Sequence, residues 1–141
     1  MSVKLPKRYR PSSKEPFMNE LQQEYFRRKL VAWRQDLLED YEETRNHLGS
    51  ADRQKGDLPD VANEELDRAL ELRTRDRERK LLAKIDEALE RLKDGTYGYC
   101  VETGQPIGLA RLEARPTASL CIAAQEAHER REKIMDRSDK N

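Results

Sequence analysis

The segment DLPDVA at residues 57–62 places two carboxylates, Asp57 and Asp60, three residues apart beside a proline that favours a turn. A carboxylate in a confined, partly dry space interacts more strongly with nearby charges than one at an open surface. Asp60 could also act as the N-cap of a following helix, which is a purely structural role. The DxxD pattern is common, so its importance depends on where the fold places it.

The segments CVET at 100–103 and CIAA at 121–124 have the spacing of a four-cysteine zinc site, CxxC…CxxC, in which Thr103 and Ala124 replace two cysteines. Structural zinc requires four N or S ligands in a tetrahedron. His128 would lie two helical turns beyond Cys121, too far along the axis to share a metal with it. We therefore expect a degenerate zinc site without metal, in which Cys100 and Cys121 pack as small apolar residues. Disulfide formation between them under oxidation is a further hypothesis.

A third candidate is the basic stretch RTRDRERK at 73–80. Helical spacing would place Arg73, Arg77, Lys80 and Lys84 on one face. Such a face is commonly solvated and paired with neighbouring acids, and the alternative is a site for a phosphate-bearing ligand or an acidic protein surface. The interrupting acids argue against free-standing DNA binding, which needs a continuous basic face.

No other pattern suggests catalysis. The chain has no glycine-rich phosphate loop and no nucleophile motif, and neither histidine has a recognisable catalytic partner. We expect a protein that is not an enzyme.

The elements that must position these residues are helical. Apolar residues from Phe26 to Leu48 recur at spacings of four and three, which predicts a helix with one narrow apolar seam. Gly49, Gly56 and Pro59 then interrupt the pattern, and a second helix is predicted from about residue 63 to 93. Two such helices make an antiparallel hairpin with arms of about 45 Å, and residues 57–62 lie at its tip. A coiled coil that serves only to dimerise remains the structural alternative.

The rest of the chain divides around this hairpin. Residues 1–16 contain three prolines and predict a flexible N-terminal arm, and residues 17–94 form the hairpin. Residues 95–124 are rich in turn residues and predict a tight turn between short strands. A final helix and tail occupy residues 117–141. The predicted fold is mainly α, with the hairpin attached to a small globular domain.

Composition supports exposed helices and places limits on location. Lys and Arg total 28, as do Asp and Glu, and charged residues make up 40% of the 141 residues. Balanced, finely mixed charge is typical of long solvated helices. No apolar run approaches a membrane span or a signal peptide, so we expect a cytoplasmic protein with reduced thiols.

Four long, collinear segments carry a family resemblance: DLPDVA, ELRTRDRERKLLAKI at 71–85, DGTYGYC at 94–100 and IGLARLEARPTASLCI at 107–122. Together with residues 17–34, they resemble the DksA branch of the DksA/TraR family over about residues 17–135. The resemblance implies a transcription regulator of the stringent response. It would bind bacterial RNA polymerase in the secondary channel, destabilise promoter open complexes, and potentiate control of ribosomal RNA and amino-acid biosynthesis promoters by ppGpp.

The resemblance also assigns roles to residues. The family's tip motif falls on Asp57, Asp60 and Ala62. The positions near the site shared by ppGpp and the polymerase rim fall on Arg77, Leu81 and Lys84. A lysine that follows the last zinc cysteine in the family is Gln125 here, which weakens one phosphate contact on paper. Two of the four zinc cysteines are absent, which implies a zinc-independent variant packed by Ile122, Ala123 and Ala124.

These expectations have two rivals. A Gre-type transcript-cleavage factor shares the hairpin with an acidic tip, but the RLEARP segment and the DxxDxA tip argue against it. A structural coiled-coil dimer is the other, whereas the resemblance favours a monomer without sequence-specific DNA binding. The promoters that respond and the strength of the ppGpp effect do not follow from the sequence.

Overall fold

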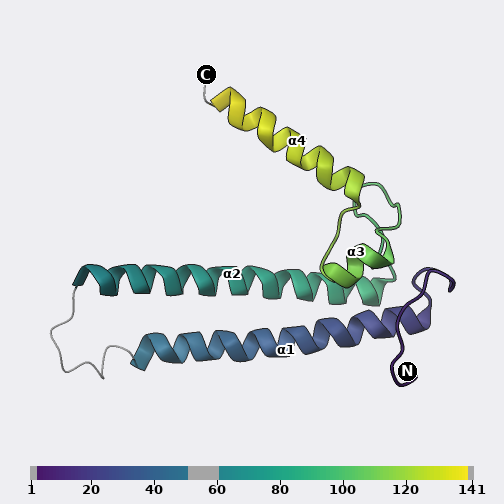
Figure 1. The fold of residues 1–141 in the computed structure, drawn as a ribbon, viewed down its shortest axis with the longest axis horizontal. Coiled ribbons are helices and arrows are strands. Elements are labelled where there is room, and N and C mark those ends of the chain that lie inside the picture. Colours follow the sequence, from purple (N-terminus) through teal and green to yellow (C-terminus); the bar gives the residue numbers. More distant parts are fainter. Residues whose placement is uncertain (1–2, 51–60, 140–141) are drawn as a thin grey trace. The chain divides into compact units, whose positions relative to one another are not determined.

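A computed structural model of the chain describes residues 3–50 and 61–139, and within that range it leaves the side chains of residues 44–50, 61, 138 and 139 undescribed. The described residues form four helices in order: α1 (Glu20–Ser50), α2 (Val61–Asp94), α3 (Leu109–Ala114) and α4 (Ile122–Asp139) (Figure 1). The mainly α fold with a long helical pair and a small globular part is as the sequence predicted. The described helices include none that is long and apolar enough to cross a membrane.

The chain folds as two compact units, and both include parts of α1 and α2. Unit 1 comprises residues 1–30 and 87–141, and unit 2 comprises residues 31–86. In unit 2 the two helices run antiparallel, because Arg34 pairs with Asp86 at 2.7 Å while Tyr41, later in α1, contacts Arg75, earlier in α2. Unit 2 is therefore a two-helix stalk.

The two long helices begin and end at identifiable signals. Met18 has a left-handed φ of 55°, and the Asn19 side chain accepts a hydrogen bond from the Gln22 N–H at 2.9 Å, so α1 begins at Glu20. The helix expected from Phe17 thus starts three residues later. Gly95, with φ of 80°, ends α2, and the Thr96 N–H donates to the Arg91 carbonyl at 3.0 Å in a Schellman motif.

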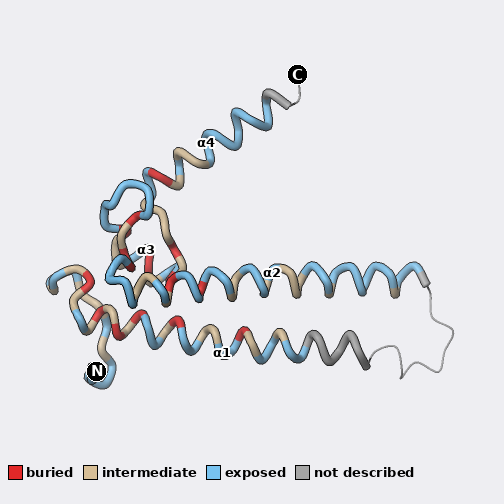
Figure 2. The backbone as a smooth tube through the Cα atoms, turned by 180° about the vertical axis from the view of Figure 1, so that it is seen from behind, coloured by how far each residue is buried: buried red, intermediate tan, exposed pale blue. Residues whose placement is uncertain are grey.

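Burial concentrates in unit 1 and along a narrow seam of the stalk, as Figure 2 shows. Phe26, Leu30 and Leu112 are fully buried in unit 1, and Tyr97 donates from its buried hydroxyl to the Pro116 carbonyl at 2.7 Å. Burial of these side chains stabilises unit 1 by about 1.5–3 kcal/mol each. In the stalk, by contrast, Leu66 and Leu70 of α2 stay at least half exposed.

The segment between α2 and α4 differs from the expected pair of short strands. Its only β pairing among the described residues is a single antiparallel bridge between Tyr99 and Pro106. Proline has no N–H to continue a ladder, which limits the pairing to one bridge. The short helix α3 was not predicted, and α4 begins at Ile122, later than the expected start near residue 117.

Residues 3–19 form a segment that we call the N-terminal strap. The buried Gln22 side chain accepts from the Met18 N–H at 2.8 Å and donates to the Ser12 carbonyl at 3.2 Å. Tyr9 packs edge-to-face on Tyr25 with ring centroids 6.2 Å apart. From residue 3 onward, the arm that the sequence predicted to be flexible therefore has defined contacts with α1.

Candidate functional site

The degenerate zinc site is assembled by one turn and the first turn of α4. The Cys100 N–H donates to the Gln105 carbonyl at 2.8 Å, and the Gly104 N–H donates to the Cys100 carbonyl at 2.9 Å. The Thr103 hydroxyl lies 3.7 Å from the Cys121 sulfur, within hydrogen-bonding reach for sulfur. Cys100 and Ala124 are buried, whereas Cys121 is half-buried. The structure therefore brings three of the four zinc-finger positions together, Cys100, Thr103 and Cys121, and Ala124 follows Cys121 in the first turn of α4.

The chemical environment of Cys100 favours a thiolate. Burial raises the pKa of the Cys100 thiol, but hydrogen bonds from the Thr103 hydroxyl and from the backbone of Cys121, Thr103 and Glu102 outweigh it and lower the pKa to about 6. Dipoles supplied by the turn thus take over part of the role that a cation would have beside a thiolate.

The residues at these positions do not fit a structural zinc ion. Thr103 offers a hydroxyl, and Ala124 offers a methyl group that is only 5% exposed. Two thiols fall short of the four N or S ligands that structural zinc requires. Across the part of the chain that the structure describes, no three His, Cys, Asp or Glu side chains are grouped so that they could hold a metal.

A polar side-chain contact joins the same turn to α4. The His128 imidazole lies 2.5 Å from the Glu102 carboxylate, and both side chains are about 40% exposed. The sequence spacing excludes His128 as a zinc ligand and predicts no other role for it. Its contact with Glu102 was not predicted, because it depends on how α4 leaves the finger region.

Three residues singled out on α2 share one face of the helix. Arg77, Leu81 and Lys84 follow one another at steps of four and three. Arg77 and Lys84 are exposed, and neither has an ion pair within the described residues, whereas Leu81 is half-buried. Two free cations around an apolar side chain are suited to an anionic ligand that also has a flat or apolar part.

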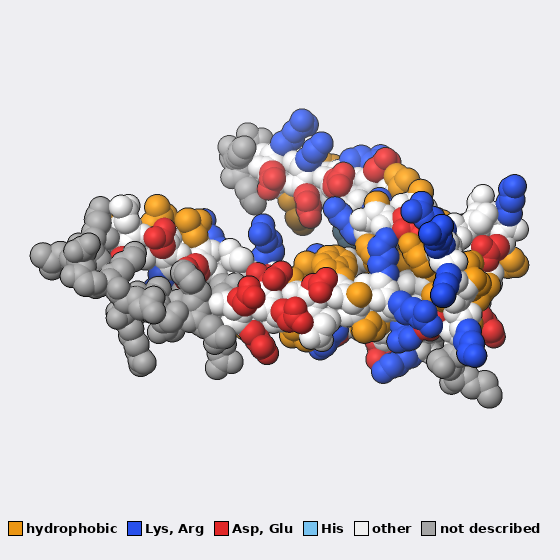
Figure 3. All heavy atoms as spheres, turned by 60° about the horizontal axis from the view of Figure 1, so that its bottom comes forward, with side chains coloured by type: hydrophobic (Ala, Val, Ile, Leu, Met, Phe, Trp, Pro, Cys, Tyr) orange, Lys and Arg blue, Asp and Glu red, His pale blue; other side chains and the backbone are white. Residues whose placement is uncertain are grey.

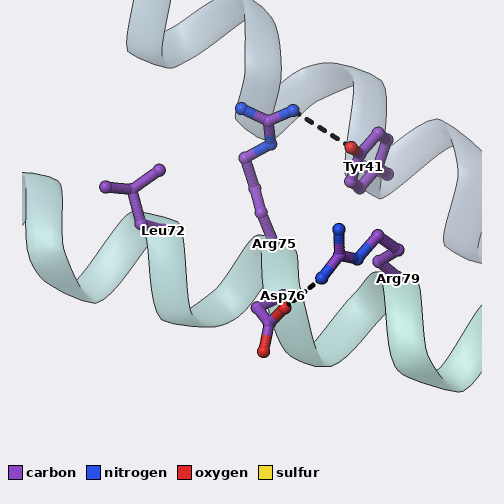
Figure 4. A pocket seen from close by; sticks show the side chains of 5 residues that line it. All are labelled: Tyr41, Leu72, Arg75, Asp76 and Arg79. Atoms are coloured by element: carbon purple, nitrogen blue, oxygen red, sulfur yellow. Dashed lines mark hydrogen bonds and ion pairs between the residues drawn. The ribbon is translucent and has the colours of Figure 1, made fainter.

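A shallow hollow of about 160 Å³ lies on another face of the stalk, lined by Tyr41, Leu72, Arg75, Asp76 and Arg79 (Figure 4). The Arg75 guanidinium lies 5.0 Å from the centre of the Tyr41 ring and donates to its hydroxyl at 3.0 Å. Asp76 is bound by Arg79 at 2.7 Å and by Lys80 at 3.0 Å. Asp76, Arg79 and Lys80 therefore pair with one another. For this part of α2, the basic stretch is a solvated helix face with internal ion pairs.

The two aspartates of the predicted tip, Asp57 and Asp60, lie outside the described residues. Ala62 is exposed in the first turn of α2, next to that segment. Since α1 ends at Ser50 and α2 begins at Val61, the aspartates belong to the connection between the two arms.

Comparison with known proteins gives a consistent result. The family model described as the N-terminal domain of DnaK suppressor protein DksA matches residues 22–92, and the model for the prokaryotic dksA/traR C4-type zinc finger matches residues 95–130. The RNA polymerase-binding transcription factor DksA of Caulobacter vibrioides is 61% identical over 126 residues, covering 89% of each chain. The chain belongs to the DksA family.

Other members agree in sequence and in structure. The RNA polymerase-binding transcription factor DksA of Escherichia coli K12 is 45% identical, covering 90% of this chain and 84% of its own. The solved structure of transcription factor DksA2 from Pseudomonas aeruginosa superimposes with a TM-score of 0.77 at 49% identity, covering 85% of this chain and 95% of its own. The DksA resemblance inferred from the sequence is confirmed, and the finger region matches a C4-type family while retaining only two of the four cysteines.

Proposed function

We propose that this chain is an RNA polymerase-binding transcription factor, as its DksA relatives are named. The observation that carries the proposal is 61% identity across 89% of both chains with a relative of that name. It is supported by a helical stalk in which the DLPDVA sequence falls where the connection between the arms meets α2. A regulator that acts by binding needs no catalytic residue of its own. On this account the chain is not an enzyme, and it works in the cytoplasm as a monomer without sequence-specific contacts to DNA.

The proposed mode of action places the stalk in the secondary channel of the polymerase. Asp57, Asp60 and Ala62 would then reach the neighbourhood of the active centre, where nucleic acid, metal ions and mobile polymerase elements meet. A differential interaction of about 1–3 kcal/mol between two polymerase conformations changes their ratio by about 5–150-fold. A preference of that size suffices to destabilise promoter open complexes, including those at ribosomal RNA and amino-acid biosynthesis promoters.

The proposed effector site is the face of α2 with Arg77, Leu81 and Lys84, at the rim of the polymerase. Support comes from the exposure of both cations and from the absence of ion pairs to them within the described residues. Phosphate groups of ppGpp would meet the two cations. Gln125 is half-buried at the start of α4 and brings no positive charge, so we propose a ppGpp response with one contact fewer than in relatives that have lysine there.

The proposed finger region holds its shape without zinc. Ala124 is buried at the sequence position of the fourth ligand. The Thr103 hydroxyl contacts the Cys121 sulfur and so links the turn to the start of α4. Hydrogen bonds between the turn and the segment before α4, such as that from the Val101 N–H to the Ser119 carbonyl at 2.9 Å, replace metal bonds.

A binding titration tests the polymerase and ppGpp assignments together. Fluorescently labelled chain is titrated with purified bacterial RNA polymerase, with and without ppGpp, and anisotropy is recorded. We expect binding that ppGpp strengthens. The variant with Arg77→Ala and Lys84→Ala should bind in the absence of ppGpp but lose most of the ppGpp effect, because both proposed phosphate contacts are removed.

A matched control removes two exposed cations of α2 that lie off this face, through Arg79→Ala and Lys93→Ala. That variant should respond to ppGpp as the wild type does. If both variants lost the ppGpp effect equally, the effect would depend on overall charge. Arg77 and Lys84 would then not form the ppGpp site. Absence of any binding to polymerase would contradict the proposed function itself.

A further inference from the structure

The N-terminal strap has a charge composition unlike the rest of the chain. Between residues 3 and 16 it holds one acid, Glu15, and five cations, all exposed: Lys4, Lys7, Arg8, Arg10 and Lys14. Helix α4, for comparison, alternates acids and bases along its length. Since Lys and Arg balance Asp and Glu over the chain, the positive charge of the strap is a local excess.

Nothing in the described part of the chain neutralises these five cations with an ion pair. Glu15 is occupied by the Tyr9 hydroxyl at 2.7 Å and by the Asn19 amide at 3.1 Å. Glu24, a buried acid of α1, is already bound by Arg27 and by Arg28. Figure 3 shows the outcome, with Lys and Arg side chains gathered on the face of unit 1 that is turned to the viewer.

The strap is held in place, which distinguishes it from a solubilising tail. The Tyr9–Tyr25 ring contact and the hydrogen bond from Gln22 to the Ser12 carbonyl attach its middle to α1. Arg28 donates to the Val3 carbonyl at 3.4 Å near its start. Arg8 has a left-handed φ of 63°, a conformation that costs a non-glycine residue energy and persists only where surrounding contacts impose it. Cations displayed on a fixed backbone lose less entropy when they bind.

The chemistry of the strap decides between two kinds of acidic partner. Protein interfaces centre on buried apolar or aromatic anchors and are depleted in lysine. Three of the five cations are lysines. The two aromatic rings of the strap are already packed, that of Tyr9 against Tyr25 and that of Phe17 against Tyr99. Contacts to a phosphate backbone need no such anchor, because released counterions supply the free energy.

We infer that the N-terminal strap binds the phosphate backbone of nucleic acid without regard to sequence. The inference does not depend on the polymerase assignment, since the strap contacts only phosphates. It is compatible with the absence of sequence-specific recognition, because the strap offers no helix or ribbon that could read base edges.

Salt dependence of binding gives a quantitative test. Full-length chain is titrated into a short labelled DNA duplex and, separately, a labelled single-stranded RNA, at several low salt concentrations. If all five cations contact phosphates of the duplex, the slope of log K against log salt should be about −4.5. The variant with Lys7→Gln, Arg10→Gln and Lys14→Gln should have a slope that is shallower by about 2.7. Circular dichroism checks that its helix content is unchanged.

The matched control removes three exposed cations of α4 through Arg131→Gln, Lys133→Gln and Arg137→Gln, and should keep the wild-type slope. Comparison of the two probes shows whether duplex DNA or single-stranded RNA is the preferred source of phosphate. The inference fails if the wild type binds neither probe at low salt, or if the strap variant and the wild type have the same slope. A third titration uses RNA polymerase without nucleic acid. The inference also fails if the strap variant loses affinity only for this polymerase, because the strap would then bind an acidic protein surface.

Discussion

The Cys100 thiolate is stabilised by hydrogen bonds from the surrounding turn rather than by a metal ion. The thiol is 3% exposed, yet the hydrogen bonds around it lower its pKa to about 6, against 9.0 for an unperturbed cysteine. The stabilisation from this thiolate should be fully present above pH 9, the unfolded-state value, and be lost as pH falls through 6.

A comparison with Cys100→Ala tests this dependence. The difference in free energy of unfolding between wild type and variant should grow between pH 6 and pH 8, by at most about 1.4 kcal/mol for each pH unit. Urea unfolding at several pH values measures it, with Cys121→Ala as a control that retains Cys100. A difference that is constant over this range would show that Cys100 acts only through packing.

The small residues of unit 1 are constrained to different degrees. A Cβ placed on Gly98, whose φ is +93°, would lie 2.7 Å from Cγ and 2.9 Å from Sδ of Met18. Gly104, with φ of +75°, has nothing within 4 Å of such a Cβ. The two positions therefore share the backbone requirement for glycine but differ in available space.

We expect Gly104→Ala to lower the free energy of unfolding by about 1–2 kcal/mol, the cost of a left-handed conformation. Gly98→Ala should lower it by more, because it must also displace Met18 and with it the junction between strap and α1. Urea denaturation of both variants provides the comparison. Equal losses would mean that Met18 moves aside without cost.

At the scale of elements, the sequence was most informative where a pattern repeats. The apolar seam that begins at Phe26 predicted the first of the paired helices, because periodic burial is a local signal. Helix α1 starts later than predicted, because no local pattern indicates the left-handed Met18, which lies close to the distant Gly98. The His128–Glu102 pair and the docked strap link distant segments, which periodicity does not report.

The candidate site was also predicted only in part from the sequence. The degenerate character of the zinc region followed directly from Thr103 and Ala124, because ligand chemistry depends on residue type. The short strands expected around it were wrong, since Pro106 limits the pairing to one bridge. The tip aspartates lie outside the described residues, and their role stays a prediction.

At the scale of the whole molecule, the account requires a chain that folds without metal. Purified wild-type protein should contain much less than one zinc per chain when assayed by mass spectrometry of the metal. The double variant Thr103→Cys with Ala124→Cys restores four cysteines at the family spacing and should bind about one zinc per chain. Zinc near one per chain in the wild type would contradict the proposed metal-free finger, whatever the double variant does.

The central claim is that the stalk delivers charge at its tip to RNA polymerase. Single-round transcription from a ribosomal RNA promoter, with purified bacterial polymerase, compares the wild type with Asp60→Asn, each with and without ppGpp. Asparagine preserves the shape of the side chain and removes its charge. We expect the wild type to inhibit transcription, whereas the variant should bind polymerase with similar affinity but inhibit weakly. Equal inhibition by both proteins would contradict the tip-charge mechanism, and failure of both to bind would contradict the assignment to polymerase.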